Sequence, residues 1–291
     1  MKKTSEEIVF NIFSLTVATL FALLCVLPIL LTVAGSFTAE KELLKGLSLI
    51  PQQLSLEAYK MILRNPSSIL RAYGVTIMLT VLGTAANLLI SSMTAYVLYR
   101  KDFKARGFFS FFFFFTTLFS GGLVPRYLLF CQLGLRNTFM ALLLDGVLSV
   151  FNMITIRSYF TANIPISLVE AAKIDGVGDF RIYVKIVLPA SGAILAATGL
   201  ITAIGYWNNW STAAIYIDNP DLYPLQYFLY RVFQTAQMKT TLSEVGISTG
   251  NVPQESYKLA MAVLTMGPVI LFYPFVQKYF VSGIMVGAVK G

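Results

Sequence analysis

The sequence predicts an all-α membrane protein of six transmembrane helices, from its composition, its long apolar segments and the positive charge between them. Hydrophobic residues make up 56% of the chain and charged residues only 12%, whereas an ordinary soluble domain carries about 25% charged residues. The mean hydropathy of +0.71 points the same way. These values argue against a soluble protein and favour one whose surface meets lipid.

The six candidate spans are long apolar segments. A transmembrane helix needs roughly 20 mostly apolar residues. The segments that approach or exceed this length are residues 8–35, 72–98, 107–130, 139–156, 190–217 and 259–281. The third contains the phenylalanine run 111–115, which a soluble helix does not tolerate on every face. The first is too long for the 7 to 15 apolar residues of a signal peptide, so we expect it to be retained.

Positive charge in the short loops predicts the orientation. The loop 100–106 has four basic residues and one acid, and Lys and Arg are retained on the cytoplasmic side. With six spans, both termini and the loop of about residues 158–189 are then cytoplasmic. The two long loops, about residues 36–71 and 218–258, face outside. Their prolines and polar residues favour ordered turns and short surface helices.

The residue types present exclude several kinds of chemistry. Histidine is absent, and Cys25 and Cys131 are expected at different membrane depths, so we predict no disulfide and no metal or haem site. We also expect no cofactor. The formal charge of +8 is spread over short segments instead of forming a stripe, so nucleic acid is not an expected partner. The chain has no Walker A pattern with which to hydrolyse ATP itself.

The segment between the fourth and fifth spans reads as a short helix, a turn and a second helix. Pro165 suits the first turn of a helix and Gly176 suits its end. Ala171 and Ala172 give the first helix small side chains that permit close approach by another surface, and Gly176 permits a sharp bend. These are properties of a docking element. Pro189 marks the start of the fifth span.

This segment resembles the EAA loop of the binding-protein-dependent ABC importer permeases, in Glu170-Ala171-Ala172, Gly176 and the Ile-Val-Leu-Pro run 186–189. The order, the spacing and the position between the last-but-two and last-but-one helices match that family. The resemblance implies the type I ABC importer permease fold, with a coupling helix seated in a groove of an ATPase subunit. An ordinary amphipathic cytoplasmic helix is the alternative. The residues implied to carry the docking are Glu170, Ala171, Ala172, Asp175 and Gly176.

Further segments are similar to the carbohydrate-uptake branch of that family, of the maltose and complex-polysaccharide types. They are residues 120–125, 152–154, 206–210, 222–226 and 287–291. The resemblance implies one transmembrane permease domain over residues 1–291, in the inner or plasma membrane of a prokaryote, importing a carbohydrate, most simply an oligosaccharide. The implied partners are a second homologous permease, two ATP-binding cassette ATPase subunits, an extracellular or periplasmic sugar-binding protein and membrane lipid.

Five residues are candidates for the substrate path: Asp145, Asn152, Trp207, Asn208 and Trp210. A carboxylate left in lipid costs at least ~2.5 kcal/mol, so Asp145 must face protein or water, and an ion pair with Arg126 is its structural alternative. Trp and Asn offer the apolar face and the hydrogen bonds that a sugar needs. However, Trp207 also falls where the outer interface favours tryptophan. For Asn152 the alternative is hydrogen bonding between helices.

Two other classes of function compete with an ATP-driven permease. An ion-coupled secondary transporter normally needs internal repeats, broken helices or a chain of intramembrane acids, and Asp145 alone gives it little support. A membrane enzyme needs a metal site, a nucleophile with its base, or paired carboxylates in one pocket. Without histidine the usual arrangements are lacking. We therefore expect a transport subunit and not an enzyme.

Overall fold

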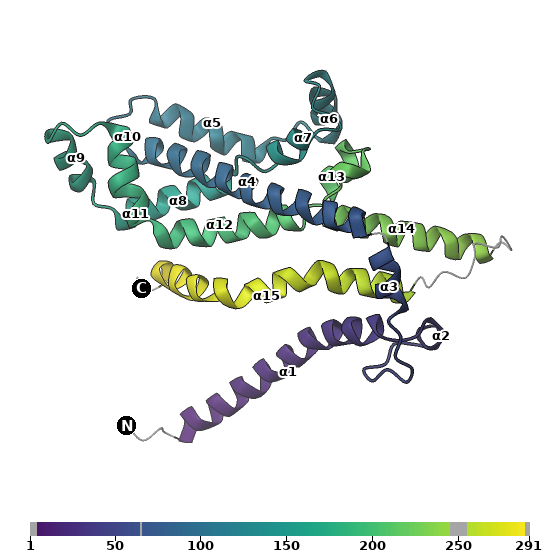
Figure 1. Cartoon of the computed structure of the whole chain (residues 1–291). Coiled ribbons are helices and arrows are strands. Elements are labelled where there is room, and N and C mark those ends of the chain that lie inside the picture. The colour runs from purple at the N-terminus through teal and green to yellow at the C-terminus, as the bar shows by residue number, and fades with distance from the viewer. Residues whose placement is uncertain (1–4, 65, 245–254, 289–291) are drawn as a thin grey trace. The chain divides into compact units, whose positions relative to one another are not determined.

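The computed structural model of the protein describes residues 5–64, 66–244 and 255–288, which form helices joined by turns and loops (Figure 1). That part of the chain contains no strand, only an isolated bridge between Thr38 and Leu54. The predicted all-α fold class is therefore confirmed. The elements are α1 (Ser5–Ser36), α2 (Glu40–Leu43), α3 (Glu57–Arg64), α4 (Pro66–Tyr99), α5 (Arg106–Leu118), α6 (Leu123–Gln132), α7 (Phe139–Leu144), α8 (Val150–Asn163), α9 (Ile166–Ile174), α10 (Asp179–Ile182), the π-helix η1 (Tyr183–Val187), α11 (Leu188–Ala190), α12 (Gly192–Trp207), α13 (Ser211–Tyr216), the 3₁₀ helix η2 (Pro220–Leu222), α14 (Leu225–Glu244) and α15 (Glu255–Ala288).

The chain divides into two compact units. Unit 1 comprises Met1–Ser67 and Leu229–Val269, and unit 2 comprises Ser68–Phe228 and Ile270–Gly291. Helices α4, α14 and α15 have residues in both units. The residues predicted to act in docking or in the substrate path all belong to unit 2. Unit 2 therefore carries the candidate site.

Unit 1 begins with α1, whose most apolar stretch has a mean hydropathy of 2.6 and buries none of its residues. An apolar stretch whose side chains are exposed in the described part of the chain needs lipid or another protein to cover it, which agrees with the first predicted span. Beyond α1, the carboxylate of Glu40 accepts hydrogen bonds from the backbone N–H groups of Glu255 (2.8 Å) and Ser256 (2.9 Å). This carboxylate satisfies N–H groups that the start of α15 leaves unpaired.

The second predicted span, residues 72–98, lies within α4, which has a mean hydropathy of 1.7 over its most apolar stretch. Among the described helices, α1 and α4 are each long and apolar enough to cross a membrane, and two bent helix pairs qualify when each pair is taken as one span. The sixth predicted span falls in α15, whose side chains from residue 272 onward lie outside the described residues. Residues 245–254 and 289–291 also lie outside them.

The third predicted span, residues 107–130, is wrong as one straight helix. Helices α5 and α6 replace it, and their axes differ by 114°. Between them lie Gly121 and Gly122, and Gly122 has a φ of +85°. Only glycine adopts that conformation without strain, so Gly122, the N-cap residue of α6, permits the bend between the two helices.

The fourth and fifth predicted spans, residues 139–156 and 190–217, are also interrupted. Helices α7 and α8 replace the fourth, and the Ser149 hydroxyl caps α8 by accepting a hydrogen bond from the N–H of Asn152 (3.2 Å). Helices α12 and α13 replace the fifth, and α12 is bent by 83° from the helical segment before it. Short polar side chains that bond to the backbone compete with helix hydrogen bonds, and hydropathy does not register that competition.

The π-helix η1 interrupts the helical segment between α10 and α11. At its end the N–H of Leu188 donates to the carbonyl of Tyr183, five residues earlier. Pro189 comes next, and because proline has no N–H, the carbonyl of Lys185 has no α-helical partner. A local departure from α-helical bonding is therefore expected at this place. Tyr183 and Val187 are buried, so the π-turn is part of the core.

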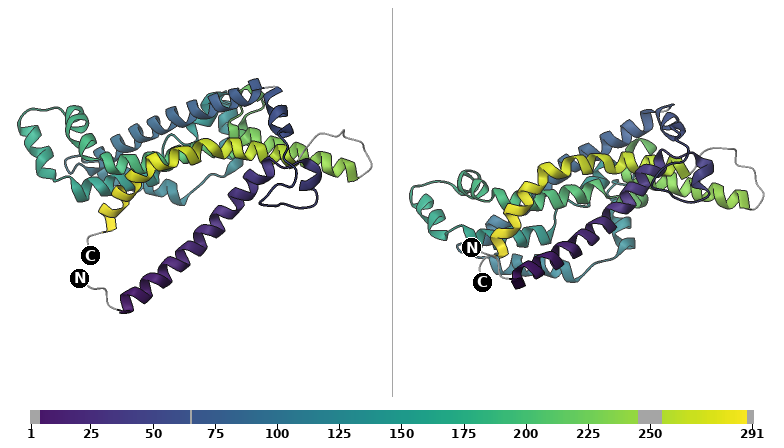
Figure 2. Two further views of the ribbon diagram at one scale, coloured as in Figure 1. Left: turned by 60° about the horizontal axis from the view of Figure 1, so that its bottom comes forward. Right: turned by 90° about the horizontal axis from the view of Figure 1, so that it is seen from below.

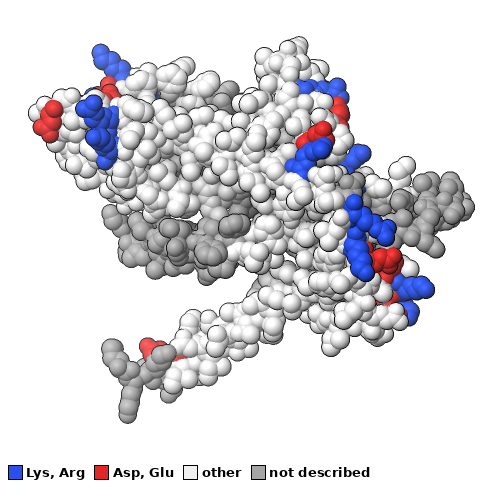
Figure 3. All heavy atoms as spheres, viewed as in Figure 1, with Lys and Arg blue, Asp and Glu red and all other residues white. Residues whose placement is uncertain are grey.

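Unit 2 has two distinct ends. Helix α9 lies beyond the ends of α4 and α8 in every view, and α6, α7 and α13 lie at the opposite end (Figures 1 and 2). These are named the α9 end and the α13 end. On the face seen in Figure 3, the charged side chains of unit 2 gather at both ends, and the surface between them is uncharged. An uncharged belt between charged ends is typical of a domain that spans a membrane.

The main core of unit 2 lies toward the α9 end. It joins α4, α8, α9, α10 and η1 through Ala95, Tyr96, Leu98, Tyr99, Met153, Ile156, Phe160, Ile164, Val169, Ala172, Ile182, Tyr183 and Val187. Val169 and Ala172 come from α9 and are 2% and 9% exposed. The short helix is thus anchored on the larger helices by apolar contacts, each side chain contributing on the order of 1 to 3 kcal/mol.

Candidate functional site

Helix α9 is stopped sharply at both ends, as the sequence predicts. Pro165 is its N-cap, and Gly176 follows its C-cap with a φ of +76°. The N–H of Gly176 donates to the carbonyl of Lys173 (2.9 Å), and the N–H of Val177 donates to the carbonyl of Ala172 (3.0 Å). This pair of bonds is a Schellman motif, which satisfies carbonyls that the last helical turn leaves free. The predicted short helix, turn and second helix are present.

The two faces of α9 differ in chemistry. Ala172 packs into the core of the unit, so its small side chain serves contacts within the chain. Glu170 and Ala171 lie on the exposed side. Leu168 and Ile174 are also exposed, by 46% and 86%. Exposed aliphatic side chains beside a carboxylate, at an end of the unit where charge gathers, form a surface suited to another protein.

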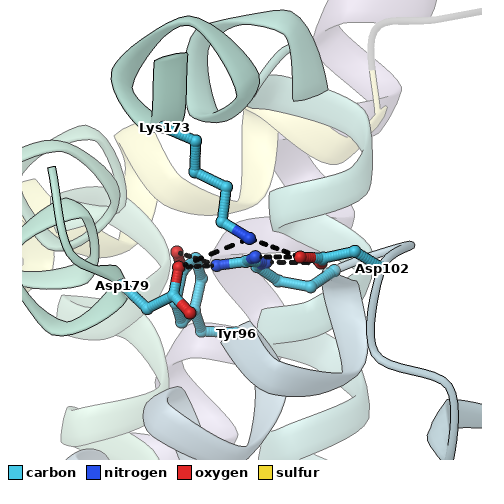
Figure 4. Close-up of polar contacts among 5 residues, drawn as sticks. Tyr96, Asp102, Lys173 and Asp179 are labelled. Atoms are coloured by element: carbon cyan, nitrogen blue, oxygen red, sulfur yellow. Dashed lines mark hydrogen bonds and ion pairs between the residues drawn. The ribbon is translucent and has the colours of Figure 1, made fainter. Parts of the chain in front are cut away.

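A polar cluster that includes Asp102, Lys173 and Asp179 lies beneath α9 (Figure 4). Arg100, which directly follows α4, makes its central contacts. The Nε of Arg100 donates to Asp102 Oδ1 (2.8 Å), and the other two nitrogens pair with Asp102 Oδ2 and Asp179 Oδ1. The Tyr96 hydroxyl accepts a further bond (3.3 Å). The Arg100 side chain is only 8% exposed, whereas those of Asp102 and Asp179 are 55% and 61% exposed. The buried guanidinium thus draws two surface carboxylates together.

Lys173 brings α9 into this cluster. Its Nζ lies 2.5 Å from Asp102 Oδ2 and 3.7 Å from Asp179 Oδ1. The hydrogen bonds from Arg100 and then Lys173 hold the pKa of Asp102 well below its usual range. The bond to Asp102 likewise raises the pKa of the Arg100 guanidinium. Asp102 and Arg100 therefore both stay charged at neutral pH. We name Tyr96, Arg100, Asp102, Lys173 and Asp179 the Arg100 cluster.

A second ion pair lies at the α13 end, where the candidate residue Asp145 ends α7 at its C-cap. Asp145 pairs with Arg126 of α6, so the expected ion pair is present. Its other oxygen accepts a bond from the Thr212 hydroxyl (2.5 Å) of α13, and Arg126 Nε donates to the Tyr216 hydroxyl (3.2 Å). The carboxylate side chain is 18% exposed and that of Arg126 is 47% exposed. Asp145 faces protein, as its cost in lipid requires.

The tryptophan and asparagine residues that follow α12 are held in different ways. Asn208 Oδ1 accepts a bond from Gln226 Nε2 (3.2 Å), and Asn209 binds both the hydroxyl (2.8 Å) and the N–H (3.1 Å) of Thr212. Trp207 closes α12 with its Nε1 buried and without a hydrogen-bond acceptor among the described residues. Trp210 is 43% exposed. Thr212 therefore links this segment to Asp145.

Asn152 lies farther inside unit 2, in a network that joins three helices. Its Nδ2 donates to Asn87 Oδ1 of α4 and to Thr202 Oγ1 of α12, both at 2.9 Å. Asn87 in turn donates to the carbonyl of Gly146 (2.8 Å), next to Asp145. The expected hydrogen bonding between helices is present. The network and the ion pair at Asp145 thus both hold the break between α7 and α8.

Several of these contacts cannot be found in the sequence. The charged loop 100–106 is visible there, but nothing in it pairs Arg100 with Asp179 or Asp102 with Lys173. Thr202 and Thr212 also carry no motif. In the described residues, no three His, Cys, Asp or Glu side chains form a group that could hold a metal ion.

Apolar helices with charged ends and polar contacts between them define a polytopic α-helical membrane protein. The chain belongs to the family of binding-protein-dependent transport system inner membrane components, which residues 87–286 match. It is therefore a transport subunit and not an enzyme, and it works in a complex with a partner permease, an ATPase and a substrate-binding protein. This membership rules out the ion-coupled alternative.

Individual relatives cover nearly the whole chain. The polygalacturonan/rhamnogalacturonan transport system permease protein YtcP of Bacillus subtilis is 40% identical over 94% of this chain and 95% of its own length. The arabinooligosaccharides transport system permease protein AraQ of Halalkalibacterium halodurans is 28% identical over 100% of both chains. A chain in the crystal structure of a bacterial ABC transporter that imports the acidic polysaccharide alginate has a TM-score of 0.83 at 28% identity, over 96% of this chain and 99% of that one.

Proposed function

We propose that the protein is the permease subunit of an ATP-driven importer that moves an oligosaccharide by alternating access. The observation that carries this proposal is α9, a sharply capped helix whose exposed face projects from one end of unit 2. The relatives named for transport of polygalacturonan/rhamnogalacturonan and of arabinooligosaccharides support the substrate class. Two ATPase subunits, a second homologous permease and a sugar-binding protein complete the complex, which lies in membrane lipid.

In this proposal α9 is the coupling helix of an EAA loop. Glu170, Ala171, Asp175 and Gly176 are exposed and available to an ATPase groove, whereas Ala172 supports them from the core. The Schellman motif at Gly176 fixes where the helix ends, and therefore which side chains it presents. The apolar contacts of Ile174 and Leu168 add buried area to the docked surface.

The proposed topology has six spans in one permease domain and both termini in the cytoplasm. The crossings are α1, α4, the bent pair α5 and α6, the pair α7 and α8, the helices from α10 to α12, and α15. The basic loop 100–106 and α9 lie at one end of unit 2, and this shared position supports a cytoplasmic α9 end. The α13 end then faces outside, where a binding protein delivers the sugar.

The candidate substrate path runs from the α13 end toward Asn152. Asp145, Trp207, Asn208 and Trp210 are the proposed outer residues, and the polar contacts around Asp145 and Thr212 support a position beside that path. The half-exposed Arg126 and the exposed indole of Trp210 offer a hydrogen-bond donor and an apolar face to a sugar.

The test is uptake by the reconstituted complex in liposomes, with oligogalacturonides, arabino-oligosaccharides and malto-oligosaccharides offered separately. We expect uptake of at least one class that requires ATP and the binding protein. Gly176→Ala should weaken ATPase co-purification about fivefold, since a left-handed residue with a Cβ costs roughly 1 kcal/mol. Uptake without ATPases, or no uptake of any of the three classes, would contradict the proposal.

A matched control exists for the glycine. Gly134 ends α6 with a φ of +69° and the same pair of backbone bonds, from Gly134 N–H to Cys131 (3.0 Å) and from Leu135 N–H to Phe130 (2.9 Å). Gly134→Ala should impose the same backbone strain at the α13 end. If it lowers ATPase co-purification as much as Gly176→Ala does, the effect is one of general stability and not of docking.

A further inference from the structure

We propose that Arg100 is a positioning residue for energy coupling, which locks α9 to the end of α4 and to the start of α10. This inference rests on the proposed function, since it concerns how motion of the coupling helix reaches the spans. Arg100 does not itself lie on the exposed face of α9. It acts through Asp102, Asp179 and Lys173.

The apolar contacts of α9 leave its orientation poorly determined. Val169 and Ala172 hold the helix on the core, but hydrophobic contacts are non-directional and permit rotation or sliding. The ion pair of Lys173 with Asp102 opposes rotation of α9 about its axis, and Lys173 lies on the same short helix as Glu170 and Ala171. A charge pair on one side of the helix fixes which face points outward.

The guanidinium joins three separate segments at one point. Arg100 extends from the end of α4, Asp102 lies in the loop after it, and Asp179 is the first residue of α10 (Figure 4). Helix α10 continues through η1 and α11 toward α12. A displacement of α9 is therefore passed to α4 through Asp102 and Arg100, and to α12 through Asp179 and α10. Without the contacts of Arg100, the turn 175–178 would be the link between α9 and α10, and its bending would absorb part of the displacement.

The geometry requires arginine at this position. Its planar fork donates two bonds to Asp102 and a further bond to Asp179, while Tyr96 lies against it with its ring centroid 5.8 Å from the guanidinium carbon. A lysine has no such fork and acts as a point charge. The side chain is also buried while both carboxylates are mostly exposed. Replacing Arg100 therefore leaves the carboxylates in water and opens the lock without stranding a buried charge.

The experiment compares Arg100→Gln with the wild type in the full complex reconstituted in liposomes. Two quantities are measured: sugar imported per ATP hydrolysed, and hydrogen exchange of the amides of residues 166–177. We expect Arg100→Gln to keep ATP hydrolysis, to lower the import ratio about fivefold and to speed exchange about tenfold, which corresponds to ~1.4 kcal/mol of local opening.

Two controls separate positioning from general effects. Lys101→Met removes a charge from the same exposed loop outside the cluster and should change neither quantity. Lys173→Met should change both quantities as Arg100→Gln does. Lys173→Arg, which keeps the positive charge, should give the wild-type import ratio and the wild-type exchange. If exchange and import ratio in Arg100→Gln match the wild type, the positioning role is refuted. If the wild type imports nothing, the proposed function fails, and the exchange data alone then decide whether Arg100 holds α9.

Discussion

The two ends of unit 2 bury opposite charges. At the α9 end the cation is buried, since Arg100 is 8% exposed while Asp102 and Asp179 are 55% and 61% exposed. At the α13 end the anion is buried, since Asp145 is 18% exposed while Arg126 is 47% exposed. A buried charge left without its partner costs far more than an exposed one. At each end the exposed partner compensates the charge of the buried one. Removal of the exposed partner should therefore lower the free energy of unfolding more than removal of the buried charge does.

The largest effect is expected from stranding Arg100. The double substitution Asp102→Asn and Asp179→Asn should lower the free energy of unfolding by about 3 kcal/mol, because the buried guanidinium loses both carboxylates. Adding Arg100→Gln to the double variant should recover most of the lost free energy of unfolding. Unfolding by SDS in mixed micelles measures this free energy for the wild type, the double variant and the triple variant. A double variant as stable as the wild type would contradict the comparison at the α9 end.

A smaller effect is expected at the α13 end. Arg126→Gln should cost about 2 kcal/mol, since Asp145 keeps the hydrogen bond from Thr212 but loses its counter-charge. The combined variant Arg126→Gln with Asp145→Asn should recover stability, because an uncharged amide needs no ion pair. The same SDS unfolding assay serves here. If the combined variant is no more stable than Arg126→Gln alone, the cost does not come from the stranded carboxylate.

The smallest effect concerns pH. The folded pKa of Asp102 lies below its usual range, so its ion pairs contribute stability above the unfolded value of about 3.9 and lose it as pH falls below that value. Exchange of the amides of residues 166–177, corrected for the intrinsic rate, should therefore be the same at pH 7 and pH 5. Lys173→Met detaches α9 from Asp102, so exchange in this variant should already be faster than in the wild type at pH 7 and should not respond to protonation of Asp102. Faster exchange of the wild type already at pH 5 would show that Asp102 is protonated there.

The sequence was sufficient to predict elements that depend on local chemistry. The spans containing α1 and α4 follow from unbroken apolar runs, and α9 follows from Pro165 and Gly176 at its ends. The interruptions at Gly122 and Ser149 were missed because a hydropathy average does not weigh the glycine conformation or the capping hydroxyl with which a new helix begins.

The polar contacts also divide into one that the sequence predicts and others that it does not. The pairing of Asp145 with Arg126 could be predicted because an acid at membrane depth needs a partner and one basic residue was available nearby. The Arg100 cluster could not, since Arg100 and Asp179 are distant in sequence and meet only when α10 folds back toward α4. Contacts of that kind depend on the tertiary structure and leave no local pattern in the sequence.

The π-helix at Tyr183–Val187 has a consequence for how this protein tolerates insertions and deletions. A π-turn accommodates one residue more than an α-turn, so every residue after it is rotated by about 100° from its place in an uninterrupted α-helix. Loss of a single codon within this stretch would remove that extra residue, restore α-helical winding and leave the following face, with the buried Ser191, pointing as before. The same loss within α12, where the winding is already α-helical, would turn the residues after it by about 100° and present the wrong side.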